Sequence, residues 1–137
     1  MRGRNLYDPW LSKVPWFLLV LKCIMTETEI KSQGRRRLAD AFLKDALREA
    51  TPWRARADLA FEALYLYALS TLDEHADDYE HPDAQALNAA AHKLELTLEQ
   101  IEPALTFLAH RYDSTFPDNG HDYRVLIGIA KLFDLSH

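Results

Sequence analysis

Residues 52–72, with the sequence PWRARADLAFEALYLYALSTL, decide which fold is predicted for this chain. Apolar side chains recur there at intervals of three and four residues, which is the period of an α-helix. Further apolar residues, among them Leu59, Ala63 and Leu69, fill positions between them, so the predicted helix is apolar around most of its circumference. A helix of this kind belongs at the centre of a bundle.

The residues before this stretch predict a break and an earlier helix. Pro52 lacks a backbone N–H and suits a first helical turn, which makes Thr51 the predicted N-cap. From about residue 27 to residue 50, apolar and charged side chains recur at spacings of three and four. Asp40 and Lys44 form a favourable i,i+4 pair in this range. We therefore expect a first helix over residues 27–50.

A third helix is expected after an acidic loop. The stretch DEHADDYEHPD at residues 73–83 is polar and reads as a loop. Its last three residues, His81, Pro82 and Asp83, open an alanine-rich helix that runs to about residue 94. The small side chains of that helix allow a neighbouring helix to approach closely.

Two more helices are expected toward the C-terminus. Thr97 and Gln100 fit a capping box, in which each side chain satisfies a backbone N–H of the other residue, and a helix follows to about residue 112. Pro103 removes a hydrogen bond inside that helix, so a restart with Glu102 as the cap stays open. After a turn cluster, a last helix is expected over residues 122–133.

The chain as a whole is predicted to be all-α, a single up-and-down bundle of about five helices over residues 25–137. Its 137 residues suit one domain, and its 48% hydrophobic and 27% charged residues are typical of a globular protein. Only four glycines are present, which disfavours an all-β chain with many tight turns. No repeat, second domain or convincing strand is evident.

Residues 1–24 differ from the rest of the chain. Four basic residues stand against one acidic residue, and residues 14–24 form an apolar run that is too short to span a membrane. The run lacks the small-residue cleavage site of a signal peptide. Met25 is followed by a polar stretch typical of the start of a cytosolic chain. This N-terminal extension is therefore interpreted either as the product of a misassigned start or as an arm packed on the bundle.

Charge and cysteine content narrow the classes of function. Residues 25–137 hold 12 basic and 20 acidic residues, a net charge of −8, and the single cysteine, Cys23, lies before them. Such an acidic body is not typical of a nucleic-acid-binding protein. One cysteine excludes a disulfide framework and a multi-cysteine zinc site. We expect a cytoplasmic protein with no cofactor and no membrane association.

The acidic loop holds one candidate metal site. His75, Asp77, Asp78 and His81 supply imidazole and carboxylate groups, which can ligate a divalent metal or act as acids and bases. Two histidines six residues apart do not share one face of a helix, and their spacing fits no defined metal motif. A solvated loop is the competing interpretation.

Arginines supply a second candidate site. Arg54 and Arg56 make the second helix locally basic, after the run Arg35-Arg36-Arg37 in the first. Arginine binds phosphate through paired N–H donors, so an RNA or nucleotide contact is one interpretation. The competing one is a solubilising surface paired to acids nearby in the sequence.

Two stretches resemble the first two helices of HEPN-type domains. They are LADAFLKDA at residues 38–46 and RADLAFEALYLYAL at residues 56–69, within a resemblance that covers about residues 30–72. The resemblance implies an all-α bundle, often dimeric. It also implies membership of a group that includes toxin ribonucleases and binding partners of a small nucleotidyltransferase.

The chain departs from the ribonuclease members of that family. Those carry an arginine and a histidine separated by four to six residues, whereas Arg111 here precedes His121 by ten. No catalytic residue is therefore carried over. The resemblance implies a degenerate, non-nucleolytic member in which Arg54, Arg56, Arg111 and His121 are the candidate nucleotide- or RNA-binding residues.

Three hypotheses about function follow. The first is a small helical binding or scaffold protein, homodimeric, that acts through contact with a protein or a nucleotide. The second is a HEPN-type ribonuclease that uses the arginines and His121. The third is a metal-dependent helical enzyme that uses the segment from His75 to His81.

Overall fold

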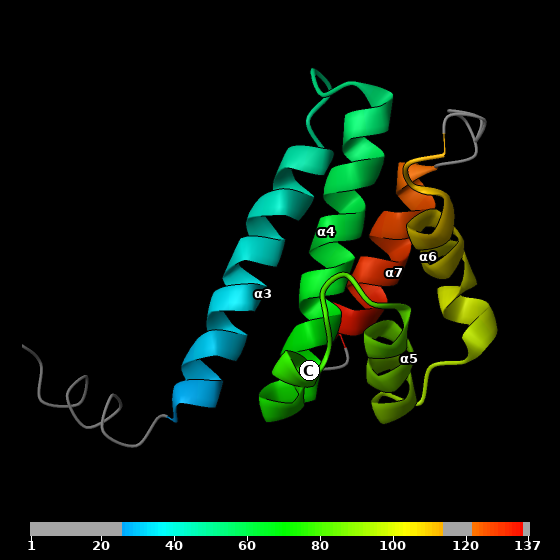
Figure 1. The fold of residues 1–137 in the computed structure, drawn as a ribbon. Coiled ribbons are helices and arrows are strands. Elements are labelled where there is room, and N and C mark those ends of the chain that lie inside the picture. The colour runs from blue at the N-terminus through cyan, green and yellow to red at the C-terminus, as the bar shows by residue number, and fades with distance from the viewer. Residues whose placement is uncertain (1–25, 114–121, 136–137) are drawn as a thin grey trace, which may run out of the picture.

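The computed structural model describes residues 26–113 and 122–135 (Figure 1). All regular structure within these ranges is helical, which confirms the predicted all-α class. The helices are α3 (Glu27–Ala46), α4 (Trp53–Leu72), the 3₁₀-helix η2 (Asp73–Asp78), α5 (Ala84–Lys93), α6 (Leu98–His110) and α7 (Tyr123–Leu135). The N-terminal extension proposed from the sequence lies outside the described residues.

Helix α4 is the centre of the bundle, as its sequence predicts. It packs against α3, α5, α7 and η2, while α6 packs against α5 and α7 (Figure 1). Twelve of its twenty residues are buried, and they cover most of the circumference of the helix, whereas Asp58, Glu62 and Leu66 on one side are partly exposed. The buried apolar side chains lose contact with water because separate helices cover separate faces.

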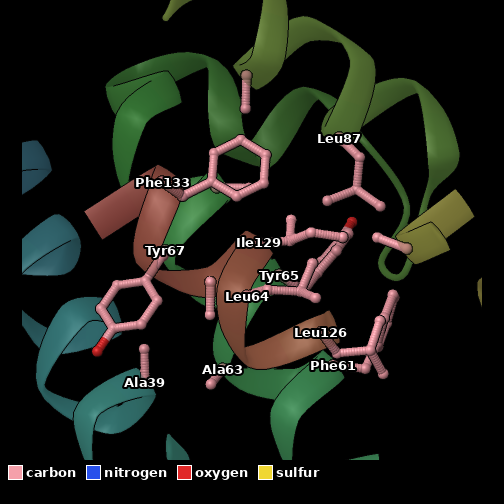
Figure 2. Close-up of a cluster of buried hydrophobic side chains, with 14 of the residues drawn as sticks. Ala39, Phe61, Ala63, Leu64, Tyr65, Tyr67, Leu87, Leu126, Ile129 and Phe133 are labelled. Atoms are coloured by element: carbon pink, nitrogen blue, oxygen red, sulfur yellow. The ribbon is translucent and has the colours of Figure 1, made fainter. Parts of the chain in front are cut away.

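The core forms where α4 meets α5, α6 and α7. Figure 2 shows side chains of α4, α5 and α7 gathered there. The largest side chains with almost no exposed surface are Phe61, Leu64, Tyr67, Leu87, Ile101 and Phe133. Alanines of α4 and α5, such as Ala60 and Ala90, are also fully buried and let the helices approach closely. The predicted role of small residues in α5 is thus visible in the packing.

The boundary between the first two helices differs from the prediction. Helix α3 ends at Ala46 rather than near residue 50, and α4 begins at Trp53 with Pro52 as its N-cap. Thr51 is not the cap, because its hydroxyl donates a hydrogen bond of 3.1 Å to the backbone carbonyl of Asp45. That bond closes the turn after α3, so the threonine serves the end of one helix rather than the start of the next.

The stretch at residues 73–83 is more ordered than the predicted loop. Its first six residues form η2, which buries Ala76 completely. Asp83 then caps α5, since its side chain accepts a hydrogen bond of 2.8 Å from the backbone N–H of Gln85. The burial of Ala76 explains the additional turn, η2. The composition of the stretch does not reveal that one of its residues is buried.

The capping box of α6 is confirmed, and the helix does not restart at Glu102. Thr97 and Gln100 satisfy each other's backbone N–H groups, and the helix runs without a break through Pro103. The proline ring is exposed, as is Glu99, whose carbonyl loses its helical donor to the proline. Solvent access to that carbonyl makes the missing bond tolerable, so Glu102 starts no new helix.

Helix α7 confirms the last predicted helix. Its residues Leu126, Ile127, Ala130 and Phe133 are buried. None of the helices in the described ranges is both long enough and apolar enough to cross a membrane.

The central position of α4 gives a first prediction. Replacing Leu64 by alanine removes a fully buried side chain and leaves a cavity, so the free energy of unfolding should fall by about 2–5 kcal/mol. Leu38→Ala is the matched control, because Leu38 on α3 is 48% exposed and should change stability by less than about 1 kcal/mol. Urea denaturation measures both, and equal losses would contradict the assignment of the core to α4.

Candidate functional site

An open hollow of about 570 Å³ lies along α4, and we call it the α4 hollow. The segment that leads from η2 to α5 borders it on one side and the end of α6 on another. Its lining residues are Arg35 of α3; Glu62, Tyr65, Leu66 and Leu69 of α4; His81 and Pro82 before α5; and Arg111 and Tyr112 after α6. Residues far apart in the sequence therefore converge at one surface of α4.

A hydrogen-bonded network fixes one wall of the hollow. The buried hydroxyl of Tyr65 lies 2.8 Å from Nδ1 of His81 and accepts a hydrogen bond of 2.8 Å from the backbone N–H of Asp83. The rings of Tyr65 and His81 meet edge to face, with centroids 5.5 Å apart. These contacts hold the segment before α5 against α4.

The same network determines the proton positions on His81. Burial raises the pKa of Tyr65 to about 12, so its hydroxyl keeps its proton at neutral pH. That hydrogen needs an acceptor, and Nδ1 of His81 is the one that the described residues place beside it. When the Tyr65 hydroxyl donates to Nδ1, neutral His81 carries its proton on Nε2. Because the His81 side chain is exposed, it offers an N–H donor to a ligand.

Arg35 forms the opposite wall. Its guanidinium donates a hydrogen bond of 3.0 Å to Asp77 of η2, and its side chain is 18% exposed. The positive charges of Lys31 and then Arg35 hold the pKa of Asp77 below its usual range. Asp77 therefore stays ionised and keeps Arg35 in place, while the guanidinium has five N–H donors, of which this contact uses one.

The four residues predicted to bind metal make three separate sets of contacts. Nδ1 of His75 lies 3.1 Å from a carboxylate oxygen of Asp78, whereas Asp77 pairs with Lys31 and Arg35 of α3. His81 turns instead to Tyr65. Across residues 26–113 and 122–135, no group of three or more histidine, cysteine, aspartate or glutamate side chains is arranged to hold a metal ion.

Arg111 forms the base of the hollow rather than an exposed anion contact. Its side chain is 10% exposed and pairs with Asp58 at 3.3 Å and with Glu62 at 2.9 Å. Its guanidinium carbon lies 5.1 Å from the ring centroid of Phe61 and 5.6 Å from that of Phe107. The cation thus fastens the end of α6 to α4 by charge and by contact with aromatic rings.

The other predicted arginines also make internal contacts. Arg54 donates a hydrogen bond to the backbone carbonyl of Arg111 and lies 3.8 Å from Asp58. Arg56 instead contacts the carbonyl of Arg48 at 2.9 Å and the hydroxyl of Tyr123 at 2.8 Å. The structure brings Arg54 and Arg111 together and turns Arg56 toward α7. His121, the fourth predicted residue, lies outside the described residues.

Sequence reasoning missed most of the hollow. Arg35 was considered only as part of a basic run, and Glu62, Tyr65 and Tyr112 were not candidate site residues. One signal was present: a tyrosine within a run of buried apolar positions needs a hydrogen-bond partner, and Tyr65 stands in such a run. The sequence does not say which partner it meets.

Comparison with known proteins identifies no relative of this chain. No protein-family model, curated protein or solved structure matches the chain. The resemblance to HEPN-type domains therefore stays a prediction from the sequence.

The buried position of Arg111 gives a second prediction. Arg111→Lys keeps the charge but loses the planar fork that pairs with two carboxylates and stacks on two rings, so the free energy of unfolding should fall by about 1–3 kcal/mol. Arg124→Lys is the control, since Arg124 is 69% exposed and pairs with Asp122 beside it. Thermal denaturation compares the two variants, and an Arg111→Lys protein as stable as the control would refute this role.

A third prediction concerns alkaline pH. Burial raises the pKa of Tyr65 from 10.0 to about 12, and burial together with the hydrogen bond to Asp40 also raises the pKa of Tyr67. Because both pKa values are higher in the folded state, this stabilisation is complete below about pH 10 and is lost as the pH rises through the folded values.

The free energy of unfolding, measured by urea denaturation at rising pH, should therefore decline between about pH 10 and pH 12. Phenylalanine at positions 65 and 67 removes the ionisable groups and should flatten this decline. If the free energy of unfolding declines equally with pH in the wild type and in the double variant, the two tyrosines do not cause the decline.

Proposed function

We propose that this chain is a small, non-catalytic helical binding module that receives its ligand in the α4 hollow. The observation that carries this proposal is the preformed state of the hollow. Tyr65 holds His81, Asp77 holds Arg35, and Glu62 holds Arg111. Side chains fixed in this way lose little conformational freedom when a ligand binds, which favours affinity.

The size and lining of the hollow support the same proposal. Its volume of about 570 Å³ lies in the range of roughly 300–1,000 Å³ typical of small-molecule sites. Leucine, proline and tyrosine side chains supply apolar area, and a few polar groups converge on it. Small-ligand sites generally combine these two kinds of lining.

The contacts of the arginines disfavour the ribonuclease alternative. A nuclease needs cations that can meet a phosphate and stabilise its developing charge. Arg111 lies between two carboxylates, and Arg54 and Arg56 donate to backbone carbonyls. Each guanidinium already has partners inside the bundle. The predicted homodimer and the predicted nucleotidyltransferase partner stay predictions, as does the cytoplasmic location.

The fourth prediction tests the proposed absence of catalysis. The full chain, incubated with labelled single-stranded RNA, should leave it intact, because Arg54, Arg56 and Arg111 already have partners within the fold. His121→Ala is the matched control for a contaminating nuclease, which would cleave equally in both preparations. RNA cleavage by the wild type that His121→Ala abolishes would overturn the proposal and favour the ribonuclease.

A further inference from the structure

We infer that the ligand of the α4 hollow is a small organic anion, a carboxylate or a phosphate ester, attached to a flat apolar body. This inference rests on the proposed function and adds the chemical class of the ligand. It follows from the donors, charges and apolar surfaces that the hollow presents together.

Arg35 and His81 are lining side chains that can donate hydrogen bonds to a ligand, whereas Glu62 is a lining acceptor that Arg111 contacts. His81 presents Nε2–H, because Nδ1 faces the hydroxyl of Tyr65. Arg35 has given one N–H to Asp77 and makes no other hydrogen bond within residues 26–113 and 122–135. The Tyr65 hydroxyl uses its hydrogen for His81 and accepts from Asp83, so it has no hydrogen left for a ligand. A ligand therefore has to bring acceptors.

The charges around the hollow also favour an anion. Its lining holds two guanidinium groups and one carboxylate, but Arg111 is already paired with Glu62 at 2.9 Å and with Asp58 at 3.3 Å, so Arg35 is the lining cation that remains for a ligand. Asp77, outside the lining, offsets part of the charge of Arg35 but leaves its other N–H groups unused. A planar guanidinium can bind a carboxylate or a phosphate through two parallel N–H donors. Arg35 is thus the residue that recognises the anionic group.

The apolar part of the lining suits a flat body. Leu66, Leu69 and Pro82 line the hollow, and Tyr112 stands at its edge with 88% of its surface exposed. The guanidinium carbon of Arg111 lies 5.5 Å from the centroid of the Tyr112 ring. A large aromatic side chain exposed to this degree is available to stack on a ligand ring. The anionic group would then face Arg35 and His81, with the flat body against Tyr112 and the leucines.

Three small probes test this arrangement: phenylacetate, phenyl phosphate and the neutral phenylacetamide. Chemical shifts of the full-length protein, followed by NMR during titration, give the dissociation constants. Ligands of about ten heavy atoms bind in the millimolar range at ordinary ligand efficiency. We expect at least one of the anions to bind about tenfold more tightly than the amide. The tighter anion identifies whether carboxylate or phosphate is preferred.

Variants separate the two halves of the ligand. Arg35→Gln should weaken the binding of both anions about tenfold and leave the binding of the amide unchanged. Tyr112→Ala should weaken the binding of all three probes. Arg37→Gln is the matched control, because it makes the same charge change on an exposed position of α3 and should have no effect. Thermal denaturation checks that every variant is folded.

Two outcomes would overturn the inference. The first is that phenylacetamide binds as tightly as both anions. The hollow would then still be a binding site, but it would have no preference for anions. The second is an equal effect of Arg35→Gln and Arg37→Gln, which would show that charge on α3 acts without a specific contact. Both outcomes can be distinguished from a failure of the proposed function, because that failure would appear as RNA cleavage.

Discussion

The structure depends on one constraint, which is that α4 carries apolar side chains around most of its circumference. A helix of this kind cannot be stable beside water, and no single neighbour can cover it. Helices α3, α5 and α7 therefore pack around it, while α6 reaches it through Phe107 and Arg111. The bundle is thus organised as a central helix with a surrounding set of partners rather than as a ring of equivalent helices (Figure 1).

The burial of α4 also determines which polar contacts form at the α4 hollow. The polar groups on this helix must find partners when water is removed. Tyr67 meets Asp40 of α3, Tyr65 meets His81, and Glu62 meets Arg111. Each of these contacts fastens a different neighbour to α4. Two of these contacts, Tyr65 with His81 and Glu62 with Arg111, also lie in the lining of the α4 hollow.

The sequence was sufficient for the helices and insufficient for the site, for a physical reason. Helical periodicity is local, so α4, the capping box of α6 and the buried face of α7 follow from nearby residues. The hollow depends on contacts between distant residues: Arg35 and Asp77 are 42 positions apart, and Glu62 and Arg111 are 49 apart. Periodicity does not specify how each helix is rotated toward its neighbours.

The same reasoning explains why individual residues have partners that the sequence does not indicate. Arg111 is a predicted nucleotide or RNA contact, and the packing of α6 against α4 places it between two carboxylates. Thr51 has the composition of a cap, but its hydroxyl meets the end of α3. Arg111 donates as its residue type implies, whereas Thr51 donates where a cap would accept, and packing sets the partner in both cases.

Native-state hydrogen exchange tests the central role of α4 most directly. If α4 is the centre of the core, its amides between about residues 60 and 70 should exchange only when the whole protein unfolds, with the same free energy as denaturant unfolding. The outer helices should open at lower free energies, because each has a side that faces water. Exchange of the α4 amides at a lower free energy than those of α3 or α7 would contradict the account.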